Sequence, residues 1–402
     1  MSDVRAHEAG LAALLSAART QPAERSAGLV APLGGNMIFF GGGLPDPVTH
    51  PTAAMTRLLT ELLAAPQEQL LGYCHGAGDD DLRRAIARHF SAREGRDISS
   101  DQIVVTNGSS GALSLLAVAL IDPGDVVLCE ALTYPGVMAT FRQMGARIVP
   151  VPVDADGISP GELASILAQL RAEGARIKMI YIIATCQSPT GTVLSEQRRH
   201  ELIEIADRFD ILIVQDATYA DIRFDESFPR ELITLAPHRT VHVASFSKTL
   251  APGLRMGWVA GPPAIIDVLA QMRTDLGTSR LVQRMVARLI ADGDFDRHLR
   301  EVNDWYRQKR DVVLDALTMS CTAHGSWKVP AGGFFIWLVL DRANLAAVEA
   351  AGAQHGVGFL GAPYFNAGGA DIPGIRLAYG ELNRAQLEEG IRRLGHAIAT
   401  AT

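Results

Sequence analysis

Short apolar segments that alternate with helical patterns dominate the chain between residues 51 and 290. Most of these segments are apolar throughout rather than alternating in polarity, which is typical of strands buried on both faces. Strands that alternate with helices along the sequence predict a mainly parallel sheet with helices on both sides. The expected strands are residues 103–105, 126–129, 148–153, 179–184, 211–214, 241–244 and 258–260.

The pattern changes after residue 290, where a smaller α/β module is expected. We predict a large domain over residues 51–290 and a small domain over residues 291–402, with a cleft between them that suits a small molecule. Residues 1–50 are predicted to form a helix (2–19) and an arm that packs with the small domain. The elements expected after residue 290 are helices over 294–319, 345–355 and 384–399, and strands over 334–340 and 375–378.

Composition and charge argue against several classes of protein. The 402 residues include 37 Lys and Arg against 44 Asp and Glu, without a basic block, so a nucleic-acid partner is not expected. The four cysteines are widely spaced and the eleven histidines form no cluster, which argues against a disulfide framework and against a metal site. Without a signal-peptide pattern or an apolar run long enough for a bilayer, we expect a cytoplasmic protein with no membrane partner.

Polar residues follow the expected strands at their carboxyl ends, where ligands gather in an open parallel sheet. Residues 106–111 read T-N-G-S-S-G and lead from a strand into a helix. Small residues at such a junction expose backbone N–H groups that can bind an anion, although a plain turn with a serine cap is the alternative. Asp216 follows another strand, where it either meets a cation or caps the next turn.

Lys248 follows the strand over residues 241–244 and is flanked by Ser245 and Ser247, with Arg255 seven residues later. Two hydroxyls and a guanidinium can bind a phosphate group. A desolvated lysine is the residue that forms Schiff bases with carbonyl compounds. This combination is specific, and it predicts a Schiff-base lysine beside a phosphate site.

The segment S-F-S-K-T-L-A-P-G-L-R-M-G-W, residues 245–258, resembles the lysine segment of class I/II aminotransferases. These are fold-type I enzymes that depend on pyridoxal 5'-phosphate. The resemblance runs from about residue 40 to the end of the chain, with the motifs in the expected order. It implies a large domain with a mainly parallel mixed seven-stranded sheet and a smaller α/β domain. It also implies amino acids and 2-oxo acids as substrates.

The resemblance implies that Lys248 carries the cofactor as a Schiff base and later moves the proton. Asp216 would pair with the pyridinium nitrogen, so that the ring accepts electrons. Tyr219, in a D-x-x-Y pattern, would donate a hydrogen bond to the phenolic oxygen of the ring, and Tyr134 would stack on it. The residues implied for the phosphate site are Gly108, Ser109, Ser110, Ser245, Ser247 and Arg255.

Three further positions match motifs of the family. Arg376, in G-I-R-L-A-Y, matches the arginine that binds the α-carboxylate of the substrate in a bidentate fork. Gly43, in the segment over residues 41–47, resembles the lining of the substrate pocket. Tyr73, in G-Y-C-H-G-A-G, matches a tyrosine that reaches the phosphate in the partner subunit. The resemblance therefore implies a homodimer with shared active sites.

The sequence departs from the family pattern in the segment Q-S-P-T-G, where Ser188 replaces the usual asparagine of N-P-T-G. That asparagine donates to the ring oxygen and helps to hold the substrate carboxylate. A hydroxyl is shorter than a carboxamide, so it reaches one of these partners, or neither without a water molecule. His50 and Pro51 also stand where an aromatic–proline pair is common.

The leading hypothesis is an aminotransferase that moves an α-amino group to a 2-oxo acid, with acidic, aromatic and aliphatic donors left open. Ser188 motivates an alternative: a pyridoxal phosphate-dependent lyase, decarboxylating or oxidative enzyme of specialised metabolism. A third possibility is a transcription regulator that joins this fold to a winged-helix domain. About 40 residues precede the core, which is too short for such a domain, so this reading is disfavoured.

Overall fold

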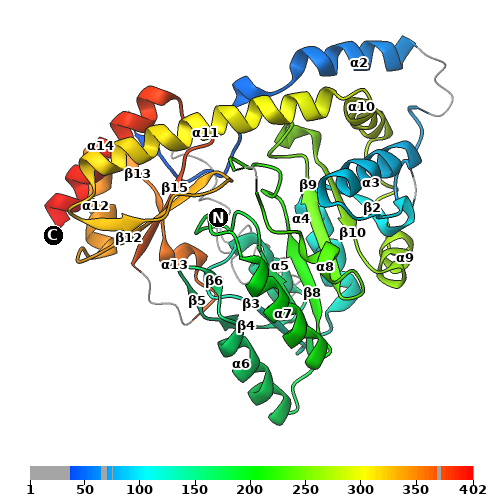
Figure 1. Ribbon diagram of the computed structural model, residues 1–402, viewed down its shortest axis with the longest axis horizontal. Coiled ribbons are helices and arrows are strands. Elements are labelled where there is room, and N and C mark those ends of the chain that lie inside the picture. The colour runs from blue at the N-terminus through cyan, green and yellow to red at the C-terminus, as the bar shows by residue number, and fades with distance from the viewer. Residues whose placement is uncertain (1–36, 65–69, 75, 226, 369–372, 402) are drawn as a thin grey trace, which may run out of the picture.

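The computed structural model describes residues 37–64, 70–74, 76–225, 227–368 and 373–401 (Figure 1). The helix predicted over residues 2–19 therefore lies outside the described residues. The described part of the N-terminal arm contains β1 (Ile38–Phe39), which pairs in parallel with β13 (Val357–Gly358). The end of this arm thus contacts the C-terminal part of the chain.

The seven predicted strands lie in one sheet, in the order β2-β10-β9-β8-β7-β3-β4. β10 is antiparallel to both of its neighbours, and the other pairs are parallel. The predicted fold class, with its mainly parallel mixed sheet, is confirmed. The strands are β2 (Ile103–Asn107), β3 (Val126–Glu130), β4 (Arg147–Val151), β7 (Ile177–Ile182), β8 (Leu212–Asp216), β9 (Thr240–Ser245) and β10 (Met256–Ala260).

Helices cover both faces of this sheet because successive side chains of each strand point to opposite sides. Val104 packs with the helices of one face, whereas Ile103 and Val105 pack with those of the other. Apolar side chains are thus buried on both faces, as the continuous apolar runs predict. The first face carries α4 (Gly108–Leu120), α5 (Pro135–Gln143) and α9 (Pro263–Gln271), and the second carries α2 (Thr52–Ala64), α3 (Asp80–Glu94), α6 (Pro160–Ala172), α7 (Glu196–Arg208), α8 (Leu232–Leu235) and α10 (Arg280–Ala291).

A second, antiparallel sheet has the strand order β11-β12-β15-β14. It packs with helices around a core that includes Phe334, Ile336 and Leu377. The helix α11 (Asp294–Ser320), yellow in Figure 1, extends from α10 to this part of the molecule. The elements predicted after residue 290 are all present, as α11, β12 (Phe335–Leu340), α12 (Leu345–His355), β15 (Gly374–Ala378) and α14 (Arg384–Ala401). Besides β13, three further short elements were not predicted: β11 (Gly325–Trp327), β14 (Leu360–Gly361) and α13 (Ala362–Phe365).

A short antiparallel pair, β5 (Val153–Asp154) and β6 (Gly157–Ile158), lies outside both larger sheets. Within the described part of the chain, no helix combines the length and apolar character needed to cross a membrane. The same residues contain no group of three or more His, Cys, Asp or Glu side chains arranged to hold a metal ion.

Candidate active site

A cavity of about 230 Å³ lies at the carboxyl ends of the central strands. Three residues that line it were not predicted from the sequence, Ile183, Thr218 and Pro252, whereas Leu44 belongs to the segment over residues 41–47 that was expected to line the pocket. Most predicted site residues meet here, although they come from segments far apart in the chain. Those that line the cavity are Gly43, Ser109, Ser110, Tyr134, Ser188, Asp216, Tyr219, Ser247, Lys248, Arg255 and Arg376.

Lys248 is partly buried, and its amine points to the N-terminal arm. The Nζ atom donates a hydrogen bond of 2.6 Å to the carbonyl oxygen of Gly43. Burial, together with the positive charges of Arg376 and Arg255, lowers the pKa of Lys248 to about 8. A lowered pKa increases the fraction of neutral amine at neutral pH, and the neutral amine is the form that attacks carbonyl carbons.

Asp216, the last residue of β8, is buried with 5% of its surface exposed. Its Oδ1 atom accepts hydrogen bonds from the backbone N–H and the hydroxyl of Thr218, at 3.0 and 2.6 Å. Its Oδ2 atom accepts one from the Tyr181 hydroxyl, at 2.8 Å. Burial raises the pKa of Asp216, whereas these hydrogen bonds and the positive charge of Lys248 act to lower it; burial is the larger effect. A cationic ligand atom beside this carboxylate would stabilise its charged form.

The helix expected from residue 112 begins four residues earlier, because α4 starts at Gly108. Its first turn is Gly108-Ser109-Ser110-Gly111, so the unpaired N–H groups of a helix N-terminus come from the small residues themselves. Gly108 has a φ of +70°, and a Cβ atom there would lie 2.8 Å from Nη2 of Arg255. Glycine at this position therefore lets a guanidinium lie against the helix N-terminus, where both attract an anion.

Ser247 and Ser245 form a pair beside this helix end. Only Ser247 lines the cavity, and Ser245 donates a hydrogen bond of 2.9 Å to its hydroxyl oxygen. Ser245 also accepts from the backbone N–H of Ser247, at 3.1 Å. Ser245 therefore orients Ser247 and does not line the cavity itself. Gly108 does not line the cavity either.

Arg376 is buried with 3% of its surface exposed and lies between two aromatic rings. Its guanidinium carbon is 4.4 Å from the ring centroid of Phe335 and 4.6 Å from that of Phe365. One amino group donates to the Ser188 hydroxyl at 3.2 Å and the other to the carbonyl oxygen of Gly41.

Within the described residues, no carboxylate forms an ion pair with Arg376, and its Nε atom has no hydrogen-bond partner. Burial lowers the pKa of Arg376 to about 10. A buried cation without a counter-charge is costly, so its natural partner is an anionic ligand.

The remaining predicted residues differ in how they relate to the cavity. Tyr219 donates a hydrogen bond of 3.2 Å to the carbonyl oxygen of Gly43, and a Cβ atom on Gly43 would lie 2.6 Å from that hydroxyl. Tyr134 lines the cavity from the start of α5. Tyr73 does not line it, and 71% of its surface is exposed.

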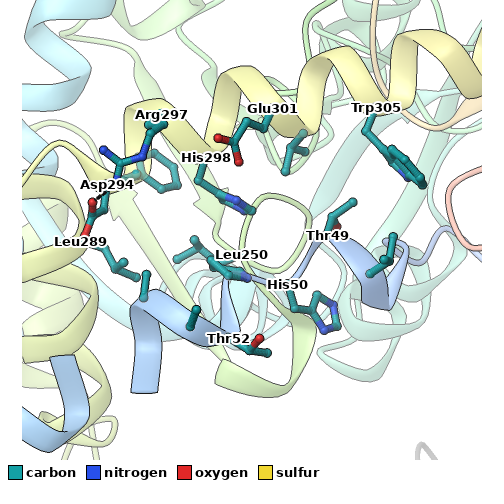
Figure 2. A pocket seen from close by; sticks show the side chains of 16 residues that line it. Thr49, His50, Thr52, Leu250, Leu289, Asp294, Arg297, His298, Glu301 and Trp305 are labelled. Carbon is teal, nitrogen blue, oxygen red and sulfur yellow. Dashed lines mark hydrogen bonds and ion pairs between the residues drawn. The ribbon is translucent and has the colours of Figure 1, made fainter. Parts of the chain in front are cut away.

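A second cavity, of about 420 Å³, lies between residues 48–54, α10 and α11. Figure 2 shows His50 and His298 on its wall, and the Nε2 atom of His298 lies 2.7 Å from the carbonyl oxygen of Thr249. No predicted site residue is among the described residues that line it. His50, found where the family usually has an aromatic residue, therefore faces this second cavity and not the one at Lys248.

The cavity at Lys248 offers partners for each functional group of pyridoxal 5'-phosphate. The aldehyde would meet an amine of lowered pKa, the ring nitrogen a buried carboxylate, and the phenolic oxygen the hydroxyl of Tyr219. The phosphate would meet the N-terminus of α4 with Ser247 and Arg255. The residues present therefore fit this cofactor.

Comparison with known proteins gives a consistent result. The family described as aminotransferase class I and II matches residues 36–394. An aromatic-amino-acid aminotransferase of Thermococcus litoralis is 32% identical over 90% of this chain and 88% of its own length. The crystal structure of a multiple substrate aminotransferase from Thermococcus profundus has a TM-score of 0.90 at 28% identity, covering 97% of this chain and 98% of that chain. A kynurenine aminotransferase from Pyrococcus horikoshii has a TM-score of 0.86 at 30% identity, covering 91% of each chain.

Proposed function

The chain belongs to the class I and II aminotransferases and is a pyridoxal 5'-phosphate-dependent amino-acid aminotransferase, and we propose that the residues around Lys248 perform its chemistry. The observation that carries this proposal is one cavity that joins an amine of lowered pKa, a buried carboxylate and a buried guanidinium without a carboxylate partner among the described residues. The relatives reported above favour transamination over the lyase and oxidative reactions considered for Ser188.

Each of these residues has a proposed task. When bound, pyridoxal phosphate withdraws electrons from the α-carbon of the amino acid and carries the amino group between the two substrates. The Nζ atom of Lys248 holds the proton taken from the α-carbon, because its lowered pKa suits an amine that both accepts and returns a proton near neutral pH. Asp216 keeps a proton on the ring nitrogen, and Arg376 binds the substrate carboxylate in its planar fork.

Ser188 has a proposed role that differs from the asparagine it replaces. Its hydroxyl oxygen accepts a hydrogen bond from Arg376 at 3.2 Å, so it helps to hold the guanidinium in place. Serine is also shorter than asparagine, so we propose that Tyr219 is the main side-chain donor to the phenolic oxygen of the cofactor. We infer that Ser188 contributes to substrate binding more than to the electronics of the ring.

We propose that the amino donor has an uncharged aliphatic or aromatic side chain. The charged residues that line the cavity are Asp216, Lys248, Arg255 and Arg376, and each already has a partner group on the cofactor or on the substrate carboxylate. The rest of the described lining offers no further charge for an acidic or basic side chain. Its larger members other than Tyr134, which is assigned to the cofactor ring, are Leu44, Ile183 and Pro252, and they provide apolar surface.

A panel of amino-acid donors with one 2-oxo acid acceptor tests both the reaction and this donor class. We expect new amino acid to form in step with consumption of the donor. Leucine or phenylalanine should exceed aspartate by about 100-fold or more in kcat/KM, because an unpaired charge in an apolar pocket costs several kcal/mol. Equal or higher values for aspartate would contradict the proposed donor class, and cleavage of the donor without formation of a new amino acid would contradict the aminotransferase assignment.

We propose a homodimer in which Tyr73 serves the site of the partner subunit. Tyr73 is 71% exposed and lies outside the cavity of its own chain, and Leu71 beside it is 65% exposed. Large exposed side chains close together are typical of an interface. Mixing inactive Lys248→Ala and Tyr73→Ala chains should restore part of the activity, since some mixed dimers then contain one intact site. Sedimentation as a monomer at micromolar concentration would exclude this arrangement.

Two further proposals rest on the sequence pattern alone. The first is the division of the chain at residues 50 and 290 into arm, large domain and small domain. The second is a cytoplasmic location. Limited proteolysis at residues 285–295 would test the domain division, and cell fractionation would test the location.

A further inference from the structure

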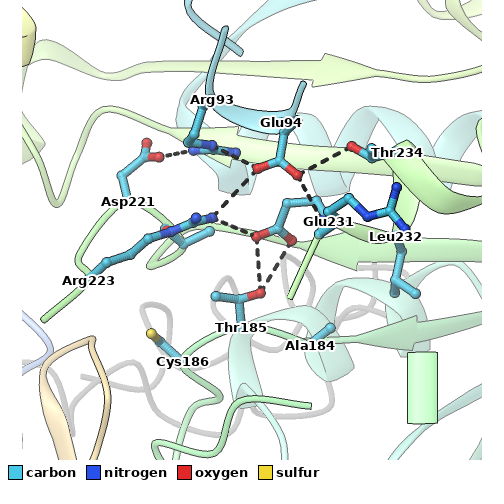
Figure 3. Close-up of polar contacts among 12 residues, drawn as sticks. Arg93, Glu94, Ala184, Thr185, Cys186, Asp221, Arg223, Glu231, Leu232 and Thr234 are labelled. Atoms are coloured by element: carbon cyan, nitrogen blue, oxygen red, sulfur yellow. Dashed lines mark hydrogen bonds and ion pairs between the residues drawn. The ribbon is translucent and has the colours of Figure 1, made fainter. Parts of the chain in front are cut away.

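A network of charged side chains, which includes the buried carboxylates of Glu94 and Glu231, lies next to the segments that follow β7 and β8. Figure 3 shows Arg93, Glu94, Asp221, Arg223 and Glu231 in this network, joined by hydrogen bonds and ion pairs. None of these residues lines the cavity at Lys248. Buried charges of this kind are expensive unless they are paired, so their presence calls for an explanation.

Glu231 lies at the centre of the network, and its side chain is fully buried. Its carboxylate accepts hydrogen bonds from the Thr185 hydroxyl, at 3.1 and 3.2 Å, and from the side-chain amide of Gln215. It also pairs with Arg199 at 3.5 Å and with Arg223 at 3.1 Å. Burial opposes the charged form, but the two guanidinium groups outweigh it and lower the pKa of Glu231 to about 2. Glu231 is therefore a carboxylate that receives donors from four separate segments.

Two of these donors lie within three residues of active-site residues in the sequence. Gln215 precedes Asp216 in β8, and its side-chain oxygen also accepts from the backbone N–H of Leu232, at 3.1 Å. Thr185 lies three residues before Ser188 in the loop after β7. The Glu231 carboxylate thus connects the strand end that carries Asp216 to the loop that carries Ser188.

The arginines of the network hold the same two segments through backbone atoms. Arg199 donates to the carbonyl oxygen of Ala184 and to the Thr185 hydroxyl, at 2.9 and 2.8 Å. Arg223 donates from Nε to the carbonyl oxygen of Ala220, at 2.6 Å, in the turn that contains Tyr219. Both guanidinium groups are themselves oriented by Glu231.

We propose that Glu231 is a positioning residue, which fixes Asp216, Tyr219 and Ser188 relative to one another by joining the segments after β7 and β8. The inference rests on the proposed function of these three residues and adds a residue that does not contact cofactor or substrate. Displacement of reacting groups by about 1 Å costs up to roughly 100-fold in rate, so a rigid connection between the two segments has a direct catalytic effect.

The test compares Glu231→Gln with a matched control in the cofactor-loaded enzyme. Glutamine keeps the size of the side chain but leaves the buried Arg199 without its counter-charge and Arg223 with Glu94 alone, at 3.7 Å. Asp125→Asn removes an equally buried carboxylate, which pairs with Arg176 and Lys178 just before β3, at the amino end of the strands. Both changes are expected to lower the melting temperature.

Kinetic and spectroscopic measurements distinguish a positioning role of Glu231 from a purely stabilising one. For Glu231→Gln we expect kcat to fall by about 10- to 100-fold with a smaller change in KM. The visible circular dichroism per bound cofactor should also decrease, since it reports how the ring is held. Asp125→Asn should keep kcat and the dichroism of the wild type.

If Glu231→Gln behaves like Asp125→Asn, Glu231 only stabilises the fold and the proposal is wrong. If Glu231→Gln gives no folded enzyme, Thr185→Val provides the test, because it removes the hydroxyl that bonds to Glu231 and Arg199 and keeps every charge. Wild-type kcat and dichroism in Thr185→Val would then overturn the proposal. Failure of the proposed function can be distinguished from failure of the positioning role, because in the first case the wild-type enzyme itself would transfer no amino group.

Discussion

Replacement of Lys248 with alanine is expected to reduce turnover by on the order of 10⁴-fold or more, because one amine both holds the cofactor and moves the α-proton. The variant should bind the cofactor only non-covalently, so that borohydride treatment fixes no cofactor to the protein. Its apo form should keep the melting temperature of the wild type within a few degrees. Lys248 forms no ion pair within the described residues, and its loss removes both its repulsion by Arg376 and Arg255 and its attraction to Asp216, which offset each other.

Lys178→Ala is the matched control for the loss of a lysine. Its ammonium pairs with Asp122 and Asp125, at 3.7 and 3.3 Å, away from the cavity. This variant should retain wild-type turnover and covalently bound cofactor. Substantial multiple turnover by Lys248→Ala would show that another group moves the proton and would refute the assigned role of Lys248.

Replacement of Arg376 with methionine is expected to lower kcat/KM by roughly 10²- to 10³-fold, which corresponds to about 3 to 4 kcal/mol of lost binding to the substrate carboxylate. The loss should appear mainly in KM, because the carboxylate is bound alike in the ground state and the transition state. The melting temperature should stay within about 4 °C of the wild type or rise. Within the described residues Arg376 has no carboxylate partner, so methionine removes an uncompensated buried charge while it still fills the space between Phe335 and Phe365.

Arg376→Lys is the informative companion because it keeps a charge but loses the planar fork. We expect its kcat/KM to lie between those of the wild type and the methionine variant. An alternative in which Arg376 is purely structural makes the opposite prediction: the methionine variant would unfold at a much lower temperature and its folded fraction would show normal KM.

Much of the fold could be predicted because its main signals are local. Continuous apolar runs and intervening helical patterns identified the seven strands of the large sheet and the order of elements after residue 290. The short strands β1, β5, β6, β11, β13 and β14 were missed, because strands of two or three residues carry no periodicity. The start of α4 was placed four residues late, since small residues look like a loop although they form the first helical turn.

The sequence predicted the site residues that lie within a recognisable motif. It missed those that reach the site only because the fold brings distant segments together. Tyr181 lies inside an apolar strand and looks like core, yet its hydroxyl donates to Asp216. Phe335 and Phe365 flank Arg376 from distant segments, which no local spacing reveals. Thr218 is the exception, because a threonine two residues after an aspartate is a recognisable turn signal.

The most direct test of the central claim is a donor-only reaction, with the wild-type enzyme and Lys248→Ala side by side. A preferred amino acid is added to cofactor-loaded enzyme without any 2-oxo acid, and 2-oxo acid and ammonia are both quantified. The account predicts that the wild type releases about one 2-oxo acid per active site and then stops, without ammonia, while Lys248→Ala releases almost none on the same timescale. Continuous release of ammonia or of a cleaved product by the wild type, or a full burst from Lys248→Ala, would contradict it.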